Sequence, residues 1–196
     1  LGFGTLQAAL MPILAWLPAA VVAPPPVSAL LHSVAVVKAG LFSFLMVVGF
    51  IMGPDYLLQS KASNWLVWLS SFTILTASII AISKDDLKAR LAYSTISQLS
   101  YIILGAALAT TFALKGASFH IITHAIGKIT LFFCAGAIYV TAHVKKISEL
   151  GGLGFKTPMI FFAYTLGALS IIGVPPFIGS WSKLFLVIGS LEADFL

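Results

Sequence analysis

The stretch GASFHIITHAIGKITLFF, residues 116–133, places two histidines and a lysine inside an otherwise apolar run. The three residues, His120, His124 and Lys128, follow one another at intervals of four positions. Because an α-helix turns by about 100° per residue, each step drifts by only about 40°, and the three side chains share one stripe with about 12 Å of rise from end to end. The stretch therefore predicts a helix with a line of protonatable groups among phenylalanine, isoleucine and leucine neighbours.

The composition of the chain places this helix in a lipid bilayer. Of the 196 residues, 60% are hydrophobic and 9% are charged, whereas an average soluble domain has about 25% charged residues. A soluble protein of this length could not hide so much apolar surface, so the natural solvent is lipid. The net charge of +5 is scattered among loops and spans, which argues against a nucleic-acid surface. The single cysteine, Cys134, excludes an internal disulfide and a zinc-type cysteine site.

Six hydrophobic segments are predicted to be transmembrane helices, because backbone groups that face lipid must be satisfied within their own segment. They cover about residues 1–17, 28–52, 64–82, 91–114, 117–140 and 159–191. The first segment is interrupted by Pro12 and the sixth by Pro175 and Pro176, which cannot be helix interior without a break or kink. The predicted fold class is an all-α, polytopic helical bundle with broken helices, in a single transmembrane domain over residues 1–196. The chain begins Leu-Gly-Phe-Gly and ends at Leu196, and we expect it to be an internal piece of a longer polytopic protein.

The basic residues outside the spans predict which loops face the cytoplasm. Two loops separated by one hairpin, residues 83–90 and 141–157, carry most of them: Lys84, Lys88, Arg90, Lys145, Lys146 and Lys156. The opposite side carries only Lys61 and Lys115. By the positive-inside rule, loops 83–90 and 141–157 are predicted to be cytoplasmic, in a bacterial-type inner membrane.

Ionisable residues within the predicted spans are candidates for function. They are His32, Lys38, His120, His124, Lys128 and Lys183, with no Asp or Glu among them. A charged lysine at the bilayer centre costs about 2.5–3.5 kcal/mol on insertion scales, so such residues mark ion pathways by default. Structural roles are the competing interpretation. A histidine can bond a backbone carbonyl, and Lys183 can extend toward an interface, whereas Lys38 lies ten residues inside its segment, too deep to do so easily.

The two interrupted segments form a second pattern. Paired broken helices at corresponding positions are typical of inverted-repeat transporters, with ion-handling residues beside the breaks. Gln7 lies just before Pro12, and Lys183 lies just after Pro175 and Pro176. Proline kinks are also common in membrane helices for purely structural reasons.

Four blocks of the sequence resemble consecutive blocks of the proton-translocating antiporter-like subunits of respiratory complex I and of the multi-subunit, Mrp-type sodium/proton antiporters. They are WLPAAVVAPPPVSALLHSVAVVKAGLF (residues 16–42), DDLKARLAYSTISQLSYIILG (85–105), FHIITHAIGKITLFFCAGAIY (119–139) and GALSIIGVPPFIGSWSKLFLVIGSLEA (167–193). The blocks occur in the family's order and cover nearly the whole chain. SALLHSVAVVKAG together with GVPPFIGSWSK is most similar to the D-type subunits of the Mrp-type antiporters.

This resemblance implies a 14-helix-type subunit of which the chain is roughly helices seven to twelve. It also implies two inverted five-helix repeats and a hydrophilic axis of lysines and histidines at mid-membrane depth. The matching positions make His32 and Lys38 the polar residues of helix eight. They make His120, His124 and Lys128 a relay along helix eleven, and Lys183 the terminal lysine after the break in helix twelve. Gln7 stands where the family usually has a lysine, whose glutamate partner would lie upstream.

The function implied is proton translocation, with sodium as a second candidate ion, by one subunit of a multi-subunit cation/proton antiporter in the lipid bilayer. Histidine passes protons by alternating donor and acceptor nitrogens, and a lysine held away from bulk water can release its proton. The alternative is a proton-pumping subunit of an NADH:quinone oxidoreductase or related respiratory complex. In either case we expect other membrane subunits as partners, no cofactor or metal, and no catalytic site of its own. Translocase activity of the oxidoreductase class would follow only within a respiratory complex.

Two other classes of function stay open from the residues themselves. His32, His120 or His124 could bind a haem or metal in a redox membrane subunit, although histidines four apart on one helix cannot sandwich a haem and no CxxCH motif occurs. Soret absorbance of the purified protein distinguishes that class. A scaffolding or degenerate subunit is favoured by Gln7, and unchanged proton flux after replacement of Lys183 would support it.

Overall fold

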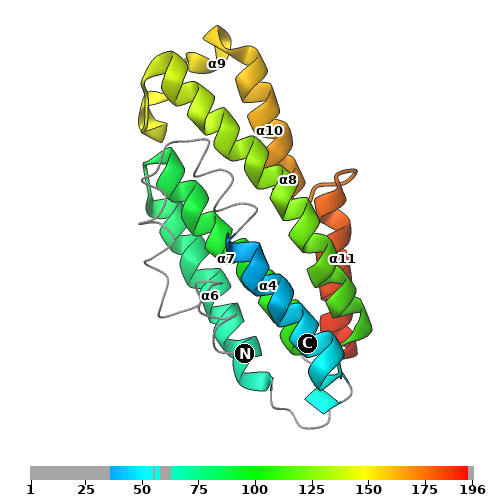
Figure 1. Ribbon diagram of the computed structural model, residues 1–196. Coiled ribbons are helices and arrows are strands. Elements are labelled where there is room, and N and C mark those ends of the chain that lie inside the picture. Colours follow the sequence, from blue (N-terminus) through cyan, green and yellow to red (C-terminus); the bar gives the residue numbers. More distant parts are fainter. Residues whose placement is uncertain (1–35, 55, 58–62, 194–196) are drawn as a thin grey trace.

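A computed structural model of the chain describes residues 36–54, 56–57 and 63–193 (Figure 1). All of the elements named in that part of the chain are helical, so the predicted all-α fold class is confirmed. In chain order they are α4 (Val36–Met46), the π-helical η2 (Val47–Met52), α6 (Asn64–Ser83), α7 (Leu87–Leu108), α8 (Thr111–Ala142), the 3₁₀ turn η3 (Ile147–Glu149), α9 (Leu153–Lys156), α10 (Pro158–Ile172) and α11 (Ile178–Glu192). Helices α6, α7 and α8 are long and apolar enough to cross a membrane.

The turn between α7 and α8 lies earlier than the hydropathy pattern predicts. The predicted segments end and begin at residues 114 and 117, whereas α7 ends at Leu108 and α8 begins at Thr111. Ala109 adopts a left-handed conformation with φ of 55°, and the Thr110 hydroxyl accepts a hydrogen bond from the Ala113 amide at 3.3 Å. The chain thus turns on a left-handed residue and a threonine N-cap. No glycine or proline marks the turn, so hydropathy alone places it a few residues late.

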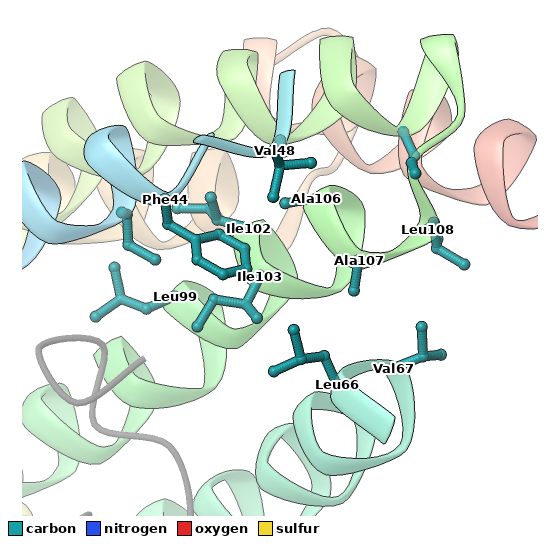
Figure 2. Packing of buried hydrophobic residues seen from close by; sticks show 14 of the residues in the cluster. Phe44, Val48, Leu66, Val67, Leu99, Ile102, Ile103, Ala106, Ala107 and Leu108 are labelled. Atoms are coloured by element: carbon teal, nitrogen blue, oxygen red, sulfur yellow. The ribbon is translucent and has the colours of Figure 1, made fainter. Parts of the chain in front are cut away.

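Helix α7 lies at the centre of the bundle. It packs against α6 on one side and α8 on the other, while α8 runs beside α10 and α11 (Figure 1). Figure 2 shows Phe44 of α4 beside Ile102 and Ile103 of α7, in the larger of two buried apolar clusters. The smaller cluster joins the start of α7 to the end of α8 and to α10.

Small residues bring the helices around α8 into close contact. A Cβ at Gly127 of α8 would lie 3.5 Å from the Gly167 carbonyl oxygen of α10, and one at Gly116 would lie 3.0 Å from the Ser182 carbonyl oxygen of α11. Lipid supplies no hydrophobic driving force between membrane helices, so association depends on such backbone approaches. The two approaches hold α8 against both halves of the last hydrophobic segment.

That last segment consists of two helices. Helix α10 ends at Ile172, Gly173 follows with φ of 87°, and α11 begins at Ile178. The connection contains Pro175 and Pro176. Pro12, the predicted interruption of the first segment, lies outside the described residues. The break in the last segment leaves the carbonyl end of α10 free for a side-chain donor.

Candidate functional site

The polar stripe of α8 faces the inside of the bundle. His120, His124 and Lys128 are only 2%, 1% and 1% exposed. Phe119 and Ile122 on the same helix are 48% and 60% exposed. The predicted stripe therefore forms a buried polar face, and the apolar face of the helix is the one left for lipid.

Lys128 reaches from α8 to α7. Its Nζ donates to the Leu91 carbonyl oxygen at 2.9 Å and to the Ser94 hydroxyl at 2.6 Å. Both acceptors are neutral, so they stabilise the ammonium without the strong hold of a carboxylate. Such a lysine is held in place but retains a proton that it can give up.

His120 links α8 to α11 through Ser182. Its Nδ1 lies 3.1 Å from the Ser182 hydroxyl oxygen, and the Ser182 hydroxyl donates to the Gly179 carbonyl at 2.9 Å. A hydroxyl has one hydrogen to give. When that hydrogen goes to the Gly179 carbonyl, Nδ1 of His120 is the donor to Ser182, and Nε2 carries the lone pair that accepts a proton.

His124 lies between His120 and Lys128 on the stripe. Its ring stacks on that of His120, with centroids 5.9 Å apart and planes 21° apart. Among the described residues, neither ring nitrogen of His124 nor Nε2 of His120 has a hydrogen-bond partner, although all three atoms are buried. A buried polar atom without a partner costs about 1–3 kcal/mol. The buried nitrogens without a partner among the described residues thus lie together at the centre of the stripe, on His120 and His124.

Lys183 closes one end of this line. Its Nζ donates to the carbonyl oxygen of Ile172, the last residue of α10, at 2.9 Å, where a cation is favoured by the helix dipole. The same Nζ lies 5.7 Å from the centre of the Tyr101 ring, and that ring lies 6.1 Å from the His120 ring. The break in the last segment therefore places a lysine next to the histidine pair.

Lys38 approaches the histidines from α4. Its side chain is 7% exposed, and its Nζ is buried with no hydrogen-bond partner in the described part of the chain. It interacts electrostatically with both His120 and His124, as Lys183 does with His120 and Lys128 with His124. Of the predicted site residues, the structure thus brings together five: Lys38, His120, His124, Lys128 and Lys183. His32 and Gln7 lie outside the described residues.

Helix α7 contributes polar side chains that sequence reasoning missed. Ser94, Gln98 and Tyr101 follow one another at intervals of four and three residues, which is the spacing of one helical face. Ser94 contacts Lys128, Tyr101 contacts His120, and the buried Oε1 of Gln98 is without a partner among the described residues. The spacing was visible in the sequence, but uncharged polar residues give no sign of which face meets a neighbour. Ser182 of α11 was missed for the same reason.

Metal ligands do not gather in the part of the chain that the structure describes. Over those residues, no three or more His, Cys, Asp or Glu side chains lie where they could hold a metal ion together.

Known proteins match this chain in sequence over nearly its whole length. The chain is 38% identical over 192 residues to NADH-quinone oxidoreductase subunit N of Desulforudis audaxviator, which covers 96% of the chain and 37% of the relative. It is 37% identical over 188 residues to NADH-quinone oxidoreductase subunit L of Mycobacterium tuberculosis, covering 95% of the chain and 29% of the relative. The chain thus spans little more than a third, or less, of these curated relatives.

Solved structures match the fold equally well. The structure of the Mrp complex from Dietzia sp. contains a chain with a TM-score of 0.90 and 29% identity, covering 98% of this chain and 35% of that one. A chain of the membrane-bound sulfane sulfur reductase, an archaeal respiratory membrane complex, gives a TM-score of 0.85 at 30% identity, covering 95% and 38%. The family described as NADH:quinone oxidoreductase/Mrp antiporter, transmembrane, matches all of residues 1–196. The predicted resemblance is confirmed: the chain belongs to the NADH:quinone oxidoreductase/Mrp antiporter family and is an integral membrane protein.

Proposed function

We propose that this chain translocates protons across a membrane, as part of one subunit of a multi-subunit complex, through Lys38, His120, His124, Lys128 and Lys183. The observation that carries the proposal is the buried line on α8, tied to α7 at Lys128 and to the broken last segment beside His120. A line of titratable groups inside an apolar bundle is costly, and the usual reason for its presence is an ion pathway. His32 and Gln7 belong to the same proposal through the family resemblance alone.

The tautomer of His120 suggests how one step would run. A proton that arrives at Nε2 gives an imidazolium, which then releases its Nδ1 proton past Ser182 to the neutral amine form of Lys183, and that amine becomes the ammonium. One N–H bond forms and one breaks, so the ring ends neutral in the other tautomer and must be reset before the next proton. Neighbours on the stripe are about 6 Å apart in rise, and bridging waters carry protons across gaps of that size.

Two parent complexes are supported by different observations. The fold match to a chain of the Mrp complex supports a cation/proton antiporter, in which sodium would be the coupled ion. The curated relatives named as NADH-quinone oxidoreductase subunits support a respiratory complex, in which redox chemistry in other subunits would drive the protons. Inverted vesicles distinguish the two, because sodium drives the pH change in the first case and NADH drives it in the second. In both cases the partners are other membrane subunits.

We propose a bacterial-type inner membrane, with loops 83–90 and 141–157 on the cytoplasmic side. The two loops lie at one end of the bundle, since the backbones of Asp86 and Lys146 form an isolated antiparallel β-bridge. Lys88 and Lys145 also approach the same Tyr139 ring, at 5.9 and 5.3 Å from its centre. Basic residues gathered at one end of a membrane bundle favour that end for the cytoplasm.

Replacing the two flanking lysines tests the relay. Lys38→Ala and Lys183→Ala, each in the full-length protein within its complex, should abolish most of the pH change in inverted vesicles while the complex still assembles. Lys115→Ala is the matched control, because this lysine is exposed at the start of α8. Normal transport in a protein that carries both alanines would overturn the proposal.

Coupling within the stripe gives a second readout. Groups that pass one proton along a line act as a unit, so His124→Ala, Lys128→Ala and the double variant should lose similar amounts of transport. Additive losses would mean that the two residues are independent packing groups.

A further inference from the structure

The contacts between α7 and α8 define which residues face each other across this pair of helices. The helices run antiparallel through the turn at residues 109–110. Ser94 contacts Lys128, Tyr101 contacts His120, and a Cβ at Gly105 would lie 3.0 Å from that of Ala117. Moving forward by a given number of residues along α7 therefore moves the facing position on α8 backward by about the same number.

This register places Gln98 opposite His124. Gln98 lies four residues after Ser94 and three before Tyr101, and His124 lies midway between the α8 partners of those two residues. The Oε1 atom of Gln98 and both ring nitrogens of His124 are buried and have no hydrogen-bond partner among the described residues. One layer of the interface thus contains two polar groups of complementary chemistry, each with a buried atom that lacks a partner in the described part of the chain.

The other groups around His124 are positively charged or titratable. Lys128 and His120 flank it on α8, and Lys38 acts on it from α4. Tyr101 of α7 contacts the adjacent His120, and Lys183 of α11 interacts electrostatically with that histidine. Gln98 is the group from α7 at this level that carries both a donor and an acceptor without charge. Its carbonyl can accept from an N–H of imidazole, and its NH₂ can donate to a bare nitrogen.

We propose that Gln98 is a positioning residue of the relay, whose side-chain amide forms a hydrogen bond with the His124 imidazole when a proton passes through that ring. The amide serves either tautomer of His124, so the ring stays between Lys128 and His120 before and after a proton passes. Because the amide is neutral, it does not trap the imidazolium form. This inference rests on the proposed proton translocation and adds a residue to it.

Two substitutions in the full-length protein, assembled in its complex in inverted vesicles, test the assignment. Gln98→Leu keeps the volume and removes the amide, and we expect transport to fall about tenfold, as for the loss of one hydrogen bond in the pathway. Gln98→Glu keeps the shape and adds a charge that favours imidazolium, so the pH profile of transport should move to higher pH. Ser97→Ala is the matched control, because the Ser97 hydroxyl faces α6, where it lies 2.9 Å from the Ser78 hydroxyl.

The remaining outcomes are equally decisive. Wild-type rates and pH profiles in both Gln98 variants overturn the assignment, and so does a loss in Gln98→Leu without an upward shift in Gln98→Glu. Failure of both variants to assemble assigns Gln98 to helix packing and overturns it as well. The His124→Ala variant separates the role of Gln98 from the relay itself. Unchanged transport in His124→Ala refutes the proposed function. Lost transport in His124→Ala, together with unaffected Gln98 variants, refutes only the role of Gln98.

Discussion

At the residue scale, His120 is the best-defined group of the site. The Ser182 hydroxyl oxygen lies within hydrogen-bond distance of both the Gly179 carbonyl and Nδ1 of His120, and when its single hydrogen goes to the carbonyl it accepts from Nδ1. The ring is also packed between Tyr101 and His124. A hydrogen bond on one nitrogen sets the tautomer, and with it the nitrogen that can receive a proton. One serine hydroxyl on α11 thus gives the proposed proton path a direction at this point.

Removing that hydroxyl should reduce transport. In Ser182→Ala, His120 loses the acceptor for Nδ1–H and both tautomers become comparable, so we expect proton transport to fall about three- to tenfold with assembly retained. Ser180→Ala is the control, because the Ser180 hydroxyl bonds the Phe177 carbonyl within its own turn at 2.7 Å. Equal transport by the two variants in inverted vesicles would contradict the role given to Ser182.

At the element scale, the contact between α10 and α11 depends on one glycine. A Cβ at Gly179 would collide with the backbone carbonyl of Ser170, so the two half-helices meet there as closely as their backbones allow. The same contact positions Lys183, one turn after Gly179, with its ammonium on the Ile172 carbonyl. The geometry of the break and the position of the lysine are therefore set together.

Gly179→Ala should separate the half-helices. Overpacking against a backbone atom costs about 1–3 kcal/mol, so we expect a lower melting temperature of the purified complex and reduced transport. Gly151→Ala is the control, because a Cβ at Gly151 meets no atom within 4 Å. A melting temperature for Gly179→Ala equal to that of the control would show that the half-helices do not need this close approach.

The loops at one end of the bundle are joined by Asp85. Its carboxylate accepts hydrogen bonds from the Ser148 hydroxyl at 2.8 Å and from the Ser148 amide at 3.1 Å, and its carbonyl accepts from the Ile147 amide at 2.8 Å. The hydroxyl and then the amide of Ser148 hold the pKa of the Asp85 carboxyl below its usual value. The carboxylate form is the one that joins loop 83–90 to loop 141–157.

This shift predicts an acid-sensitive contact. Because the folded-state pKa is depressed, the stabilisation is complete above the ordinary aspartate pKa of 3.8 and is lost as the pH falls through the lower folded value. The melting temperatures of the wild type and Asp85→Ala should therefore differ at pH 6 and converge toward pH 3. A difference for Asp85→Ala that is constant with pH would contradict the argument.

At the scale of the whole molecule, the two basic loops mark one end of the bundle and the α7–α8 turn marks the other. Lys88 and Lys145 lie near Tyr139 at the end of α8, whereas Lys115 lies near Phe112 at its beginning. Helix α8 has 32 residues, about 48 Å of rise, which exceeds the hydrocarbon core of about 30 Å. Both ends of α8 can thus reach the membrane surfaces.

Thiol labelling should reveal the orientation. In a protein with Cys134→Ala, single cysteines at Lys88 and Lys145 should react with a membrane-impermeant reagent in inverted vesicles, where the cytoplasmic side faces outward. A cysteine at Lys115 should react in intact cells instead. The reverse pattern would place loops 83–90 and 141–157 outside and contradict the proposed topology.

The sequence predicts those features of the structure that depend on interactions between residues close together in the chain. The four-residue spacing of His120, His124 and Lys128 predicts a stripe on one helix, and the apolar runs predict membrane spans, because helical periodicity and hydropathy are local properties. The motif blocks also indicate the family without a structure. Even the local signals miss the α7–α8 turn, where a left-handed alanine and a threonine cap replace the usual glycine or proline.

The partners of the stripe follow only from packing between helices. That Lys128 meets Leu91 and Ser94, more than 30 residues away, depends on the antiparallel register of α7 on α8. That Ser182 reaches His120 depends on the close approach of α11 to α8, which the lack of a side chain at Gly116 allows. Nothing in the local pattern of α7 or α11 distinguishes the face that meets α8, because uncharged polar side chains occur on several faces of a membrane helix. The line of protonatable groups is thus a property of one helix. The hydrogen bonds of these groups and the position of Lys183 near His120 arise from contacts between helices distant in the chain.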